Sequence, residues 1–368
     1  MRQTFWGWRP TIASLIRLFI VALFALAALE TAGGAIPNGR TMVFDMDGIV
    51  LFHVPPDSEG QRLIRAQTDS TGGGDIAAEA DVYRVADGFG ELIDFLVERG
   101  WRVSVFSFGN ALRNRSAASA ISLPRGGTLL SAIEATGGRV YSNVDGYNLD
   151  PNDLRKVIYA TLPKAQRPKI VKDLAKVMPA QEAAQAFLVE DILINSAPGK
   201  TIAGNRLPGQ RETHTVHMPY RYVIDANGKP VHFMEYPDGF EGAVRRSDLR
   251  ATRHALELFS ELRNKMAYLA GLVVEIESRM AANPRQSFSD VLQDMQWQRE
   301  ANGAFRLDRN GDRMVRPELL SSDSITHRGS EILERMPNSS YKFVLPFNPG
   351  KLCGPLAQAF DRMLSTGH

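Results

Sequence analysis

The sequence predicts an α/β protein with a Rossmann-like core, in which helices cover a parallel sheet. First, β-type segments alternate along the chain with segments whose apolar residues recur at helical spacing. Second, acidic or hydroxyl residues directly follow several strand-like segments, as in sheets that bind ligands at their carboxyl edge. Third, helical patterns dominate after about residue 247.

The elements of the first half follow in chain order. Residues 41–47, TMVFDMD, begin with an apolar run that predicts a buried strand. Residues 90–100, GELIDFLVERG, carry apolar side chains at helical spacing and end on a glycine, which favours a helix stop. Residues 101–109, WRVSVFSFG, are rich in β-branched and aromatic side chains and predict a second strand.

Further elements are predicted beyond residue 165. Residues 170–178, IVKDLAKVM, indicate a helix that ends before Pro179. Residues 184–194, AQAFLVEDILI, indicate another buried strand. Residues 219–236 contain two strand-like runs around Asn-Gly, which predicts a hairpin.

Composition and breaks in the pattern divide the chain into three parts. Residues 1–35 are predicted to be a signal peptide, 36–246 the α/β core, and 247–368 a mainly helical extension. Within the core, residues from about 53 to 80 contain two prolines and a triple glycine. We expect this segment to form a small flap over the carboxyl edge of the sheet.

An apolar stripe in the extension predicts a long helix within residues 247–283. Its members are separated by alternating steps of three and four, and Asn283-Pro284 stops the helix. The stripe either docks on its own domain or forms a homodimer through this helix. Its residues are Phe259, Leu262, Met266, Leu269, Val273, Ile276 and Met280.

The first 35 residues have the order of an export signal: a basic start, an apolar run of about 12 residues and then small residues. The run is shorter than the about 20 residues that span a bilayer, so we expect a cleaved signal and a periplasmic or secreted protein. An uncleaved membrane anchor and an organelle transit peptide are the alternatives. The segment holds three arginines and one glutamate, so the net charge of +2 falls to zero without it, which gives no support for nucleic-acid binding.

The motif DMDG, residues 45–48, directly follows the first predicted strand. Two carboxylates at this spacing can hold a hard divalent cation such as Mg²⁺. One can attack phosphorus as a nucleophile, while the other acts as general acid and then as base. Gly48 lets the chain turn sharply and approach a phosphate closely. An Asp-Gly turn without function is the alternative, but the apolar residues on both sides favour a site.

The stretch VFDMDGIV, residues 43–50, resembles the first motif of the haloacid dehalogenase (HAD) superfamily of phosphohydrolases. The resemblance implies a HAD-type core, with Asp45 as the nucleophile and Asp47 as the acid/base. Ile49 stands where the family commonly has threonine. An acid two residues after the nucleophile is more typical of a phosphatase than of a dehalogenase.

The second and third family motifs supply phosphate ligands and a lysine. VSVFSFGN places Ser107 at the end of a strand, and the resemblance implies that Ser107, Phe108 and Gly48 bind the phosphate, with the serine contributing its hydroxyl and backbone N–H. RPKIVKDLAKV offers Lys172 as the lysine that offsets phosphate charge. Lys169 is the substitute.

The fourth family motif is an acid or acidic pair after a buried strand. AFLVEDILIN supplies Glu190 and Asp191, and Asn195 stands where the family often has a further acid. The resemblance implies that Mg²⁺ is held by Asp45, the backbone carbonyl of Asp47 and Asp191. Glu190 is the alternative ligand to Asp191.

The resemblance covers about residues 41–200. VKDL before a helix and FLVED, together with YRVADGFGELIDFL, is similar to the branch of phosphatases of the RNA polymerase carboxy-terminal domain and NLI-interacting-factor-like proteins. We therefore expect a Mg²⁺-dependent phosphomonoester hydrolase that forms an aspartyl-phosphate. Its substrate would be a phosphoprotein or a small phosphoester. The alternatives are a non-catalytic protein-binding module and a secreted effector phosphatase.

Overall fold

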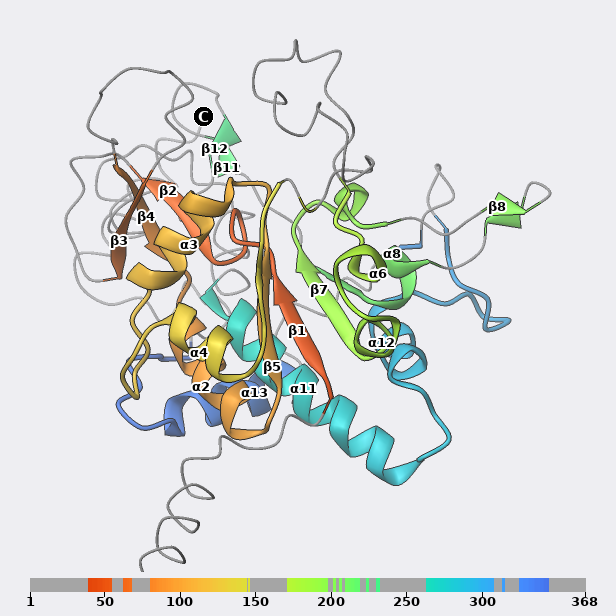
Figure 1. The fold of residues 1–368 in the computed structure, drawn as a ribbon. Coiled ribbons are helices and arrows are strands. Elements are labelled where there is room, and N and C mark those ends of the chain that lie inside the picture. The colour runs from red at the N-terminus through yellow and green to blue at the C-terminus, as the bar shows by residue number, and fades with distance from the viewer. Residues whose placement is uncertain are drawn as a thin grey trace, which may run out of the picture.

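A computed structural model gives the arrangement of the chain (Figure 1). Among the residues that it describes, five strands form one parallel sheet and several helices pack around it. The predicted α/β class with a parallel sheet is therefore confirmed, and the architecture is compatible with a Rossmann-like core. The described residues are 39–54, 62–67, 80–143, 145, 171–197, 201–202, 205–206, 209–218, 223–224, 230–231, 263–307, 313–314 and 324–343.

The central sheet is built from short, largely buried strands that all run parallel to their neighbours. In spatial order they are β10 (Thr215–His217), β7 (Ala186–Glu190), β1 (Thr41–Phe44), β5 (Arg102–Phe106) and β6 (Val140–Tyr141). Phe44, the last residue of β1, lies opposite Val105 on one side and Val189 on the other. The residues that follow β1 and β7 therefore leave the sheet side by side at its carboxyl edge.

Side chains of β1 alternate between two apolar layers, because successive residues of a strand point to opposite faces. Met42 and Phe44 belong to the larger cluster, which includes residues of α2 (Phe89–Glu98) and α4 (Leu129–Ala135). Val43 belongs to a smaller cluster with residues from α6 (Leu174–Val177) and α7 (Ala180–Ala183). Cover on both faces explains why the strands are apolar almost throughout.

Helix α3 (Ala111–Ala120) begins at the carboxyl edge of the sheet, shortly after β5. Asn110 starts it, because its side-chain oxygen accepts a hydrogen bond of 2.7 Å from the backbone N–H of Arg113. This cap places the first turn of α3 beside the loops that follow β1 and β5.

The helix predicted over residues 170–178 is shorter than expected. It covers only Leu174–Val177, and Asp173 is its N-cap. Lys172 instead forms an isolated parallel bridge with Ser196 and donates its backbone N–H to the carbonyl oxygen of Asn195 at 2.8 Å. The extended backbone here directs Lys172 into the protein.

A second, antiparallel sheet has the order β2 (Leu51–Val54), β4 (Ala80–Val85) and β3 (Leu63–Gln67). It falls partly in the range predicted for a flap. Residues 55–61 and 68–79 lie outside the described residues, so the flap stays a prediction.

Two pairs of very short strands complete the described β structure. β11 (Val223–Ile224) and β12 (Pro230–Val231) pair antiparallel, as expected for the hairpin around Asn-Gly. β8 (Thr201–Ile202) and β9 (Asn205–Arg206) form the other pair.

Three helices of the C-terminal third pack against the core: α11 (Lys265–Ala282), α12 (Phe288–Gln296) and α13 (Ser324–Arg335). Met266, Leu269, Val273 and Ile276 of the predicted stripe are fully buried in the larger apolar cluster. The stripe therefore docks on its own chain over these positions, and a homodimer through the helix stays a prediction. Phe259 and Leu262 lie outside the described residues.

Helices α11 and α13 approach each other with their backbones in contact. A Cβ atom added at Gly271 would lie 1.9 Å from the carbonyl oxygen of Ile325, and one added at Gly329 would lie 1.8 Å from that of Ala267. Both positions therefore require glycine at this crossing.

The side-chain amide of Gln296, at the end of α12, pairs with the edge strand β10. Its Nε2 donates to the carbonyl oxygen of Thr215 at 2.5 Å, and its Oε1 accepts from the backbone N–H of His217 at 3.1 Å. Next to it, Trp297 Nε1 donates to the carbonyl oxygen of Glu212 at 2.6 Å. These bonds attach the end of α12 to β10 and to the short helix Gln210–Thr213 that precedes it.

The predicted signal segment, residues 1–35, lies outside the described residues. Among the helices that the structure does describe, none combines the length and apolar character needed to cross a membrane.

Candidate functional site

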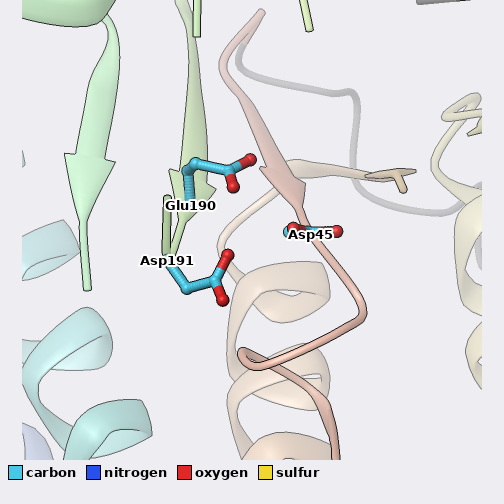
Figure 2. Close-up of side chains that lie close together, drawn as sticks. All are labelled: Asp45, Glu190 and Asp191. Atoms are coloured by element: carbon cyan, nitrogen blue, oxygen red, sulfur yellow. The ribbon is translucent and has the colours of Figure 1, made fainter. Parts of the chain in front are cut away.

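Three carboxylates meet at the carboxyl edge of the sheet (Figure 2). Asp45 follows β1, Glu190 ends β7, and Asp191 follows directly. Each contributes an oxygen atom, and these atoms all lie within 4.8 Å of one another. The pairing of β1 with β7 produces this arrangement, since the backbone N–H of Asp45 donates to the carbonyl oxygen of Val189 at 3.0 Å.

Lys172 lies between two of these acids. Its Nζ is 2.5 Å from Asp45 Oδ2 and 2.6 Å from Glu190 Oε2, and only 1% of its side chain is exposed. Gln210, at the start of α8 (Gln210–Thr213), holds the backbone there, because its Nε2 donates to the carbonyl oxygen of Lys172 at 2.7 Å. The lysine is therefore fixed by its backbone as well as by its charge.

Burial raises the pKa of all three carboxyl groups. It raises the pKa of Asp45 to about 7, with the charges of Glu190 and Asp47 acting in the same direction and Lys172 opposing them. Burial and the nearby charge of Asp45 raise the pKa of Asp191 to about 6. The pKa of Glu190 is also raised by burial, although Lys172 lowers it. One lysine thus does not offset the negative charge of the cluster.

The pKa of Lys172 itself lies above its ordinary value. Burial lowers this pKa, but the charges and hydrogen bonds of Asp45 and Glu190 outweigh burial. The lysine therefore carries a positive charge near neutral pH.

The donor set fits Mg²⁺, which prefers carboxylate oxygen ligands and is helped by uncompensated negative charge. Glu190 is already engaged: besides Lys172, it accepts hydrogen bonds from the backbone N–H of Ile192 at 3.1 Å and from Asn195 Nδ2 at 3.3 Å. Since Asp191 makes fewer of these bonds, it is the preferred ligand beside Asp45, with Glu190 as the alternative. Asp45 itself contacts Lys172 and accepts a hydrogen bond from the backbone N–H of Met46 at 2.7 Å. Asn195 supports Glu190 through the bond from its Nδ2.

The side chain of Asp47 points to different partners. Its Oδ2 accepts hydrogen bonds of 3.1 Å from Ser107 Oγ and from Arg113 Nη1, and its Oδ1 contacts Arg113 Nη2. The Asp47 side chain is 54% exposed, in contrast to the buried Asp45. The two aspartates of the motif therefore have separate cationic partners.

The other predicted phosphate ligands lie around the same edge. Ser107 is buried, and both of its predicted phosphate donors have a partner within the protein: the backbone N–H donates to the carbonyl oxygen of Tyr141 at 3.4 Å, and the hydroxyl donates to Asp47 Oδ2 at 3.1 Å. The Phe108 ring lies 4.6 Å from Lys172 Nζ. Gly48 has φ of 76° and donates its N–H to the carbonyl oxygen of Leu51 at 3.0 Å, so it makes the sharp turn that was expected.

Sequence reasoning did not identify Arg113, Gln210 or Tyr83 as members of the site. The guanidinium carbon of Arg113 lies 5.0 Å from the centre of the Tyr83 ring. One signal for Arg113 was available: Asn110 follows the second strand as a typical helix N-cap, which puts Arg113 in the first turn at the sheet edge. Gln210 and Tyr83 have no comparable local signal.

The comparisons with known proteins leave the function to be inferred from this geometry. No protein-family model matches the chain, and no curated protein matches it. The described residues bring together the three carboxylates, the buried Lys172, and Asp47 with its partner Arg113.

Proposed function

We propose that this protein is a Mg²⁺-dependent phosphomonoester hydrolase that forms an aspartyl-phosphate on Asp45. The main support is that Lys172 Nζ lies 2.5 Å from Asp45 beside two further acids, at the edge of a parallel sheet where ligands bind. We further propose that residues 36–246 are a HAD-type core related to the carboxy-terminal-domain phosphatases. In this proposal the β2-β4-β3 sheet belongs to a flap, and residues 247–368 are a helical extension.

In the first step, a carboxylate oxygen of Asp45 attacks phosphorus, and the bond between phosphorus and the leaving oxygen breaks. Asp47 gives a proton to the leaving alkoxide. Lys172 and the Ser107 hydroxyl offset negative charge on the other phosphoryl oxygens. The products are the free alcohol and a phosphorylated Asp45.

In the second step, Asp47 takes a proton from a water molecule, and the water oxygen attacks phosphorus. The bond between phosphorus and Asp45 breaks, which releases inorganic phosphate and restores both aspartates. Arg113 contacts both oxygens of the Asp47 carboxylate that takes this proton.

Asp45, Asp191 and the backbone carbonyl of Asp47 would hold the cation, with Glu190 as the alternative ligand. When bound, Mg²⁺ supplies positive charge that offsets the charge of the phosphoryl group.

The substrate would be a phosphoprotein or a small phosphoester. We propose that residues 1–35 direct export, so that the reaction takes place in the periplasm or outside the cell. A secreted effector would carry out the same chemistry on host proteins. A non-catalytic binding module is the second candidate, but the charge partners kept for both Asp45 and Asp47 favour catalysis.

Hydrolysis of p-nitrophenyl phosphate by the purified protein tests the proposal. Its leaving group needs no proton, so the assay reports on Asp45 independently of Asp47 as an acid. We expect release of p-nitrophenolate with Mg²⁺, loss with EDTA, and loss in Asp45→Asn. Asp294→Asn, which alters a half-exposed acid, should retain activity. Activity that survives in Asp45→Asn would refute the assigned nucleophile.

A further inference from the structure

We propose that Arg113 is a positioning residue for the reaction above: it holds the Asp47 carboxylate in the orientation used for proton transfer. The inference rests on the proposed function and adds a residue that the family resemblance does not supply. Arg113 lies in the first turn of α3. This helix follows β5, the strand that flanks β1 on the side opposite to β7.

The contact between the two side chains fixes orientation as well as position. Arg113 Nη1 lies 3.1 Å from Asp47 Oδ2, and Nη2 contacts Oδ1. A guanidinium that reaches both oxygens sets the plane of a carboxylate, which a single ammonium group does not. Ser107 Oγ adds a third contact, at 3.1 Å from Oδ2.

Arg113 is itself held rigidly. Nη1 also donates to Asn114 Oδ1 at 3.1 Å, and the guanidinium lies 5.0 Å from the centre of the Tyr83 ring. Asn114 is fixed in turn by donating to the carbonyl oxygens of Ser107, Gly109 and Tyr141.

Gly109 leaves the room that the guanidinium occupies. A Cβ atom added there would lie 2.9 Å from both Cδ and Nη1 of Arg113 and 2.4 Å from Asn114 Oδ1. The arrangement therefore depends on glycine immediately before the N-cap of α3.

Burial is unequal across the pair: 7% of the Arg113 side chain is exposed, against 54% of that of Asp47. Burial lowers the pKa of Arg113, but the charge and hydrogen bonds of Asp47 outweigh burial and raise it, so Asp47 offsets the cost of burying the guanidinium. Without the arginine, the Asp47 carboxylate would lose its two-point contact and keep the single contact with Ser107 Oγ. The buried arginine thus holds a carboxylate that stays accessible from solvent, which fits a role in orienting Asp47.

The test is a double-mutant cycle on hydrolysis of a phosphate ester of an aliphatic alcohol, whose leaving group needs the proton of Asp47. Because small misplacement of a reacting group is costly, we expect Arg113→Ala to lower kcat by about 10- to 100-fold while KM changes by less than about threefold. In an Asp47→Asn background, Arg113→Ala should lower kcat by less than about twofold further. Arg113→Lys should also be slow, since it keeps the charge but loses the two-point contact.

Added guanidinium, below unfolding concentrations, should restore part of the activity of Arg113→Ala but not that of Arg113→Lys. Arg115→Ala is the matched control, because Arg115 lies on the same helix, is 60% exposed and pairs with Glu134. If Arg113→Ala does not fold, the kcat of Arg113→Lys is the deciding measurement. A wild-type kcat in Arg113→Lys would then overturn the inference.

Wild-type kcat in Arg113→Ala, or a full additive loss in the Asp47→Asn background, would overturn the inference while leaving the proposed function intact. If the wild-type protein hydrolyses no phosphoester, the proposed function fails and takes the inference with it.

Discussion

Replacing the candidate nucleophile by its neutral isostere, Asp45→Asn, should stabilise the protein. Asp45 is buried, and its pKa of about 7 lies about three pH units above the ordinary value of 3.8. The folded protein therefore binds this proton more tightly than the unfolded chain does. Stability falls as pH rises from about 4 to about 7, and it stays reduced at higher pH.

The size of the effect follows from the same difference. One pH unit corresponds to about 1.4 kcal/mol, so ionising Asp45 lowers the free energy of unfolding by on the order of 4 kcal/mol at pH 8. In Asp45→Asn, Lys172 still has Glu190 as a charge partner at 2.6 Å, so the lysine is not left buried without an acid beside it. We expect a net gain of about 2–4 kcal/mol at pH 8, and almost none at pH 4.

Urea unfolding in EDTA, at pH 8 and at pH 4, measures this difference. Asp294→Asn is the control, because it changes a half-exposed acid and should shift stability by less than about 0.5 kcal/mol. With Mg²⁺ added, the gain should shrink, because binding then stabilises the wild type. A variant less stable than the wild type at pH 8 in EDTA, or an equal gain at both pH values, would refute the reasoning.

Three further predictions concern the lysine, the helix contact and the metal. Lys172→Met should abolish hydrolysis. It should also lower the free energy of unfolding at pH 8 by about 3–5 kcal/mol in urea titrations, because two buried acids lose their cation. A decrease of less than about 1 kcal/mol would contradict this prediction. Gly329→Ala puts a methyl group 1.8 Å from the carbonyl oxygen of Ala267, so the same titration should show a loss of about 3 kcal/mol, and an unchanged midpoint would contradict the close helix contact. Asp191→Asn should weaken Mg²⁺ binding in calorimetry by about tenfold or more, and by more than Glu190→Gln; equal effects would argue against Asp191 as the preferred ligand.

The parallel sheet could be predicted because its strands are buried on both faces. TMVF and AFLVE are apolar or β-branched nearly throughout, a pattern that a half-exposed strand does not have. The helix Phe89–Glu98 was also predictable, since its apolar residues recur at helical spacing before Gly100.

Features that depend on partners distant in sequence were not predictable. Helix α6 begins only at Leu174, because Lys172 forms a bridge with Ser196. No pattern in the neighbouring sequence predicts this bridge. The carboxylate cluster was anticipated from the order of the strands, but the contact of Arg113 with Asp47 depends on space left by Gly109. The catalytic roles themselves stay predictions until hydrolysis is measured.

The pairing of Gln296 with β10 has a consequence for the behaviour of the protein at high concentration. An edge strand with unpaired backbone groups is a template on which a strand of another molecule can form. Here one amide side chain occupies the carbonyl of Thr215 and the N–H of His217, two groups with which such a strand could pair. Helix α12 thus closes this edge with a side chain instead of a strand, which protects the protein against edge-to-edge aggregation.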